Sequence, residues 1–339
     1  MKNKFRNLFL AFGILAVIIM LFTFDVSYDE LLDNLRRAGF YLPLVLVLWL
    51  FIYLINTLSW YIILRSSGPV NSLSFARLYK FTVSGFALNY VTPVGLMGGE
   101  PYRIMELTPY VGVECATSSV ILYVMMHIFS HFCFWLSSVL IYVFFYPVGW
   151  GMGIVLGLTT LFCLLLVTLF IKGYRNGMAV ACVRLGSHIP FLKKRAVRFA
   201  ELHKEKLETI DSQIALLHQQ RKSTFYLALG LEYTARIVGC LEVWLILNVL
   251  TTDVSFVGCI LIVAFSSLLA NLLFFLPMQL GGREGGFALA VAGLSLSGAY
   301  LTISSRYSFK IPLYSSLTAF ILLVVRNALM GAGRPPIAT

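Results

Sequence analysis

The sequence predicts an all-α polytopic membrane protein with about six transmembrane helices and two re-entrant hairpins of broken helix, arranged as an inverted repeat. Three observations predict this fold. First, hydrophobic residues make up 59% of the 339 residues and charged residues only 12%, whereas soluble domains have about 25% charged residues. Second, the hydrophobic residues gather in stretches long enough to span a bilayer. Third, two further apolar stretches are interrupted by proline and glycine.

Six stretches have the roughly 20 mainly apolar residues that a transmembrane helix needs. They are residues 8–24, 41–64, 117–146, 151–171, 223–250 and 311–330. The first follows Lys2, Lys4 and Arg6 and resembles a signal peptide, but no small-x-small cleavage site comes after it. We therefore expect it to remain as the first transmembrane helix.

The two broken stretches cover roughly 75–97 and 254–303. Pro93 lies near Gly98 and Gly99 in the first, and Pro277 near Gly281 and Gly282 in the second. A broken backbone at membrane depth has unsatisfied N–H and C=O groups, so it is tolerated only where it is buried in protein or lines a wet cavity. Both stretches are therefore predicted to be re-entrant hairpins.

The two broken stretches also match each other. An offset of 184 residues places Pro93 on Pro277 and Glu100 on Glu284, and it maps 41–64 and 117–146 onto apolar stretches. The predicted organisation is then a first helix with an outer loop (1–40), a first repeat with its hairpin (41–146), a connecting helix with a basic loop (147–222) and a second repeat with its hairpin (223–334).

Basic residues predict the orientation, because lysine and arginine are enriched in cytoplasmic loops. The three basic residues before position 8 place the N-terminus in the cytoplasm. The 172–222 loop carries eleven Lys or Arg against four acidic residues and is expected on the same side. The stretches 41–64 and 223–250 then cross in opposite directions, as inverted repeats require. We expect a multi-pass protein of the cytoplasmic membrane, that is, the inner membrane.

Charged side chains in apolar stretches are costly, so they are expected to face a cavity or a partner. Glycines allow close approach to the backbone, and arginine offers forked donors to phosphate oxygens. We expect a substrate site for an anionic headgroup, with the glutamates as counter-charges or proton carriers; structural ion pairs that hold the hairpins shut are the alternative. The candidate residues are Gly98, Gly99, Glu100, Tyr102, Arg103, Gly281, Gly282, Arg283 and Glu284.

A second group of polar residues lies within the spans. Glu232 and Arg236 are four apart, so they share a helix face and can pair, while Glu242 points elsewhere around the same helix. His127 and His131 share one face of the 117–146 stretch. Two histidines can relay protons or bind metal, but no third ligand is evident, so we expect hydrogen-bonded core histidines and no metal.

Other functional classes lack support in the sequence. The net charge of +11 comes mainly from residues between the spans, so it indicates topology rather than a nucleic-acid partner. The six cysteines form no CxxC pair and are read as small hydrophobic residues. No P-loop or GxSxG signature is present, and no cofactor is expected. The tryptophans, Trp60 among them, are read as core residues or interfacial anchors.

Both motifs resemble conserved blocks of a known family. The stretch from Pro93 to Arg103, followed by Gly112 and Ser119, and the stretch from Pro277 to Gly285 are similar to the two glycine–glutamate blocks of the flippase-like transmembrane domain of lysylphosphatidylglycerol synthases. The resemblance covers nearly the whole chain. It implies translocation of lipid between leaflets, without the soluble aminoacyl-transferase half.

The sequence therefore favours a transporter over an enzyme. The expected activity is flipping of an anionic phospholipid or a polyprenyl-linked headgroup, with membrane lipids as partners. A membrane-embedded transferase acting on a polyprenyl-phosphate or phospholipid substrate is the enzyme alternative, and a non-catalytic envelope scaffold is the third. A homodimer or an envelope-enzyme partner stays open.

Overall fold

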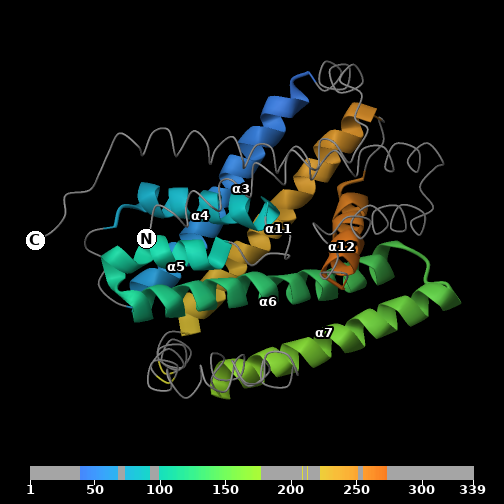
Figure 1. Cartoon of the computed structure of the whole chain (residues 1–339). Helices are drawn as coiled ribbons and strands as arrows, with labels where there is room; N and C mark the ends of the chain where they lie inside the picture. The colour runs from blue at the N-terminus through green and yellow to red at the C-terminus, as the bar shows by residue number, and fades with distance from the viewer. Residues whose placement is uncertain are drawn as a thin grey trace, which may run out of the picture. The chain divides into compact units, whose positions relative to one another are not determined.

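A computed structural model describes residues 39–67, 73–91, 99–176, 208, 212, 222–250 and 255–272. The regular elements in this part of the chain are all α-helices, which confirms the predicted all-α class (Figure 1). They are α3 (Tyr41–Ser67), α4 (Phe75–Val91), α5 (Gly99–Val111), α6 (Val113–Phe145), α7 (Trp150–Asn176), α11 (Lys222–Leu250) and α12 (Phe256–Leu272).

Four of the six predicted spans correspond to α3, α6, α7 and α11. Spans 8–24 and 311–330 lie outside the described residues, as do Pro93 and the second glycine–glutamate stretch. The number of transmembrane helices, the two re-entrant hairpins and the inverted repeat therefore stay predictions.

Local sequence explains where α6 begins and ends. Gly112, just before it, has φ +81°, a left-handed conformation that glycine adopts without a steric penalty. Tyr146, just after it, is extended at φ −131° and ψ 147°, because the following Pro147 disfavours helical backbone in the residue before it. A 33-residue apolar helix is thus bounded by a glycine turn and a proline.

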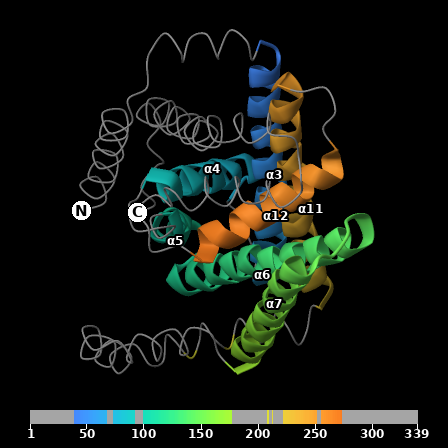
Figure 2. The ribbon, with the colours of Figure 1, turned by 90° about the vertical axis from the view of Figure 1, so that its right-hand side faces the viewer.

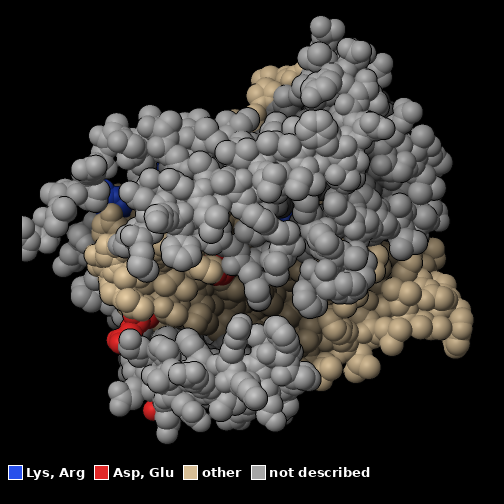
Figure 3. Space-filling model, viewed as in Figure 1, with Lys and Arg blue, Asp and Glu red and all other residues tan. Residues whose placement is uncertain are grey.

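Some of the described helices have the length and apolar character of membrane spans. Three of them contain segments that are long and apolar enough to cross a bilayer, namely Pro43–Ser66, Val113–Phe145 and Trp150–Ile171. On α7, the side chains of Ile154, Leu158, Leu161 and Leu165 are 51–67% exposed at helical spacing. On the face shown in Figure 3, the described surface is mainly neither acidic nor basic. Such an uncharged, apolar surface is suited to lipid.

The described residues fall into two compact units. The first unit contains those up to Tyr53, those within Ala76–Tyr102 and those from Ile237 onward, and the second contains Leu54–Phe75 and those within Arg103–Arg236. In the first unit, the rings of Tyr53 and Phe86 stack with centroids 5.3 Å apart. In the second, α7 packs against α6 (Figure 2), where the rings of Phe129 and Phe170 stack at 4.6 Å.

Candidate functional site

The first glycine–glutamate motif forms the N-terminal turn of α5, in the first unit. The side-chain carbonyl of Asn89, on α4, accepts a hydrogen bond of 2.7 Å from the backbone N–H of Gly99. The amide of Asn89 donates to Oε1 of Glu100 at 3.0 Å. The first N–H groups of a helix have no partner within the helix, so Asn89 satisfies one of them and orients the motif's carboxylate.

We expect Asn89→Ala to destabilise the protein by about 1–3 kcal/mol, because it removes the acceptor of a buried backbone N–H. Asn271→Ala is the matched control, since Asn271 donates to the carbonyl of Ser267 one turn earlier in its own helix, α12. Thermal unfolding of the purified variants measures the difference. Equal midpoints for the two variants would contradict this role for Asn89.

Arg103 lies one turn further along α5, in the second unit, and only 1% of it is exposed. Its guanidinium carbon is 5.2 Å from the ring centroid of Tyr123 and 6.0 Å from that of Trp60. The two rings themselves stack with centroids 5.6 Å apart. A cation facing aromatic rings at these distances gains about 0.5–2 kcal/mol from each, which helps to hold the charge inside an apolar unit.

The indole of Trp60 adds a buried donor beside this cation. Trp60 is 0% exposed, and its Nε1 has no hydrogen-bond partner among the described residues. A buried donor in this state is unusual in a folded protein and calls for an explanation. The guanidinium of Arg103 and the nearby N–H of Trp60 are both groups that bind anions.

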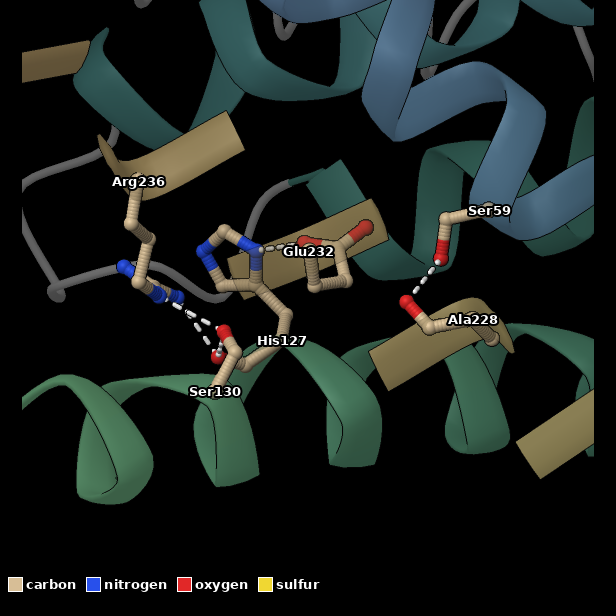
Figure 4. Close-up of polar contacts among 6 residues, drawn as sticks. All are labelled: Ser59, His127, Ser130, Ala228, Glu232 and Arg236. Carbon is tan, nitrogen blue, oxygen red and sulfur yellow. Dashed lines mark hydrogen bonds and ion pairs between the residues drawn. The ribbon is translucent and has the colours of Figure 1, made fainter. Parts of the chain in front are cut away.

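Glu232 and His127 form a hydrogen-bonded pair in the second unit (Figure 4). Oε2 of Glu232, on α11, lies 2.8 Å from Nδ1 of His127, on α6. Glu232 is 1% exposed, whereas 32% of the His127 side chain is exposed. The imidazole therefore borders the space outside the packed helices, and the carboxylate lies behind it.

Arg236, one turn after Glu232, fastens α11 to α6. Its Nε donates to Oγ of Ser130 at 2.6 Å, and its NH2 group donates to the backbone carbonyl of His127 at 2.5 Å (Figure 4). The predicted shared face of Glu232 and Arg236 is thus directed at α6. Glu232 contacts His127 there, and Arg236 contacts Ser130 and the backbone of His127.

Two neutral contacts reinforce the packing around α11. Ser59, on α3, donates to the carbonyl of Ala228 at 3.2 Å, and Ser137, on α6, lies 2.8 Å from the hydroxyl of Tyr233.

Arg103 and Arg236 both interact electrostatically with His127. We call Arg103, His127, Glu232 and Arg236 the buried polar cluster; it holds two arginines and one glutamate.

Comparison with known proteins agrees with this membrane architecture. The family model of the lysylphosphatidylglycerol synthase transmembrane region matches residues 8–305. The chain belongs to this family. A UPF0104 membrane protein of Methanothermobacter thermautotrophicus is 23% identical over 314 residues, which cover 90% of this chain and 89% of the relative. No solved structure matches the chain.

The lysylphosphatidylglycerol synthase family was predicted from the two glycine–glutamate motifs, and the structure describes only part of them. Gly98, Gly281, Gly282, Arg283 and Glu284 lie outside the described residues. Whether these residues meet the first motif stays a prediction.

The remaining predicted residues divide between the two units of this family member. Gly99, Glu100 and Tyr102 belong to the first unit, whereas Arg103 belongs to the second. Tyr102 is buried. Glu242 is buried in the first unit.

The two histidines belong to a row of rings along α6. Tyr123, His127, His131 and Trp135 are spaced by four, and successive ring centroids are 6.3, 5.6 and 5.3 Å apart. Within the described residues, no group of three or more potential metal ligands occurs. The four rings contact one another in sequence along this helix.

Proposed function

We propose that this protein translocates an anionic lipid or a lipid-linked anionic headgroup between the leaflets of the cytoplasmic membrane. The observation that carries the proposal is the buried cation Arg103, held by two aromatic rings inside an apolar helical unit. Burying a charge away from water is costly, and ionisable residues inside membrane proteins mark substrate or ion pathways by default.

The charges and donors of the second unit favour an anion as the substrate. The buried polar cluster has two arginines against one glutamate, so an anionic headgroup would offset its excess positive charge. Arginine binds phosphate oxygens through paired N–H groups, and the Nε1 of Trp60 supplies a further donor. A phosphate or phosphoglycerol group fits this set of groups better than a neutral headgroup does.

Translocation requires at least two conformations, because the headgroup must reach the site from each leaflet. With Arg103 only 1% exposed, the state described here is closed around the cation. In our proposal, binding of the headgroup favours conformations in which Arg103 is accessible from one leaflet. The predicted inverted repeat, with Arg283 and Glu284 in its second half, would provide the opposite opening.

Reconstituted protein tests the proposal directly. Proteoliposomes would carry fluorescently labelled phosphatidylglycerol, polyprenyl phosphate or phosphatidylcholine, and a membrane-impermeant quencher would report which leaflet each label occupies. We expect at least one anionic lipid to move about ten times faster than phosphatidylcholine, a discrimination of ~1.4 kcal/mol. Protein-free liposomes are the control. Equal rates for all three lipids, or rates no higher than in the control, would reject the proposal.

A further inference from the structure

We propose that Glu232 is a proton-binding site inside the membrane, loaded through His127, and that its proton and the anionic headgroup bind cooperatively. The inference rests on the proposed function for its second half only, since proton binding can be tested without any lipid movement. It assigns proton binding to the hydrogen-bonded pair between α6 and α11 rather than to the glycine–glutamate motif.

The geometry of the pair is that of a relay with one inner and one outer member. Glu232 is 1% exposed and His127 is 32% exposed, so the imidazole is the member that a proton reaches first. Oε2 of the glutamate faces Nδ1 of the histidine at 2.8 Å. Its other oxygen, Oε1, is buried without a hydrogen-bond partner among the described residues, although a buried carboxylate normally has both oxygens satisfied. Protonation of the carboxyl lowers that penalty, because a neutral oxygen costs less to leave unpaired in an apolar environment than an ionised one does.

The transfer step balances in atoms and charge. An ionised carboxylate only accepts hydrogen bonds, so in the neutral ring Nδ1 carries the proton and Nε2 is the basic nitrogen. Nε2 takes a proton from a hydronium ion, which becomes water, while the Nδ1–H bond breaks and an O–H bond forms on Oε2 of Glu232. The imidazole ends neutral in its other tautomer. Glu232 changes from a charge of −1 to neutral.

Several further titratable or charged side chains are present on the helices around the pair. Within the described part of the second unit, they include Tyr123, His131 and Cys133 on α6, Arg103 and Glu106 on α5, and Tyr233 and Arg236 on α11. From α3, the neutral Ser59 donates to the carbonyl of Ala228, one turn before Glu232. On α7, the segment Trp150–Ile171 contains no Asp, Glu, Lys, Arg or His. Arg103 and Arg236 are thus matched by Glu232 and Glu106, so an excess of positive charge arises when Glu232 is protonated.

Protonation of Glu232 links proton binding to anion binding through this excess. It removes the cluster's carboxylate and leaves the charges of Arg103 and Arg236, so an anion is attracted more strongly. By thermodynamic reciprocity, a bound anion raises the proton affinity of the site by the same factor. The proton and the headgroup would then enter one state together, and a proton gradient would bias the direction of lipid movement.

Infrared difference spectroscopy tests proton binding in purified protein without any transport. The C=O stretching band of a protonated carboxyl is recorded as the pH is lowered, in neutral detergent with short-chain phosphatidylglycerol or short-chain phosphatidylcholine. We expect Glu232→Gln to lose a band that the wild type shows. Glu242→Gln, which alters another buried glutamate of α11, should keep that band.

The same titration tests the linkage to the anion. We expect the midpoint pH of the Glu232 band to be about one unit higher with phosphatidylglycerol than with phosphatidylcholine, a tenfold change in proton affinity. A band that survives in Glu232→Gln, or a midpoint that is the same in both lipids, would overturn the inference. If the midpoint shifts but lipid does not move in proteoliposomes, the proposed function fails and the proton–anion linkage stands.

A second variant covers the case in which Glu232→Gln does not fold. His127→Gln keeps an amide donor for the carboxylate but cannot pass a proton from one ring nitrogen to the other. We expect the Glu232 band to form at least about ten times more slowly after a pH jump in this variant, because the imidazole relay contributes about that much or more. Loading at the wild-type rate would overturn the role given to His127.

Discussion

Replacing Arg103 with Gln is expected to lower the translocation rate of an anionic lipid at least about tenfold, a loss of ~1.4 kcal/mol. Gln keeps a polar amide but has neither the charge nor the forked donors of the guanidinium. In the proposed mechanism Arg103 is the cation that the headgroup meets between Trp60 and Tyr123, so its removal acts on anionic lipids above all.

Arg65→Gln is the matched control for this experiment. Arg65 lies near the exposed end of α3, with its guanidinium carbon 5.0 Å from the ring centroid of Tyr61. The control thus removes the same charge and a similar cation–ring contact outside the buried polar cluster. We expect translocation within about twofold of the wild type, because exposed charge contacts contribute little.

Arg103→Lys separates the need for charge from the need for a planar cation. Lysine keeps the charge, but it is a compact, strongly hydrated ion that cannot lie flat on the two rings. We expect a rate between those of the wild type and Arg103→Gln. Folded Arg103→Gln protein that moves phosphatidylglycerol or polyprenyl phosphate at the wild-type rate would rule out Arg103 as the headgroup site.

The sequence predicted the described helices well because their length and apolar character are local properties. Spans 41–64, 151–171 and 223–250 differ from α3, α7 and α11 by a few residues at their ends. The exception is the first part of α6, which begins at Val113 rather than at 117. Because this first turn of α6 contains polar residues such as Glu114, the hydropathy pattern did not mark it as part of the predicted span. Gly112, just before it, does indicate a break in the helical backbone.

The partners of the charged residues could not be predicted in the same way. Helical spacing correctly placed Glu232 and Arg236 on one face of α11, but the contacts of that face come from α6, more than a hundred positions earlier in the chain. The histidines were expected to be hydrogen-bonded core residues. His127 is hydrogen-bonded, but it is also a third exposed, and exposure depends on how helices pack rather than on local sequence.

The roles of Trp60 and Asn89 in the candidate site could not be predicted from the sequence pattern around them. Trp60 was expected to be either core or an interfacial anchor, and its role beside Arg103 follows only from the packing of α3 against α5 and α6. Asn89 lies in an apolar stretch before the glycine–glutamate motif and fixes the start of α5. A buried Asn ten residues before a Gly-Glu pair is the kind of pattern that could have indicated a helix cap.

Gly99→Ala is expected to prevent stable folding of the first unit, with a cost of about 3 kcal/mol or more. A methyl group at Gly99 would overlap the backbone carbonyl oxygen of Gly85, on α4, and would lie 2.8 Å from Oδ1 of Asn89. Backbone cannot move aside as a flexible side chain can, and overpacking typically costs 1–3 kcal/mol and occasionally more. The added methyl also disturbs the Asn89 hydrogen bond to the N–H of Gly99.

Gly157→Ala is the matched control, because it adds the same methyl group at a position where we expect no loss of stability. Nothing lies within 4 Å of a methyl group built at Gly157, in the middle of α7, so alanine there should be neutral or should stabilise the helix by up to about 1 kcal/mol. Thermal unfolding in detergent, followed by the fraction of monodisperse protein, compares the two variants. If both unfold at the wild-type temperature, then α4 and α5 are not in backbone contact at Gly85 and Gly99. In that case the glycine of this motif would be required by the substrate rather than by the fold.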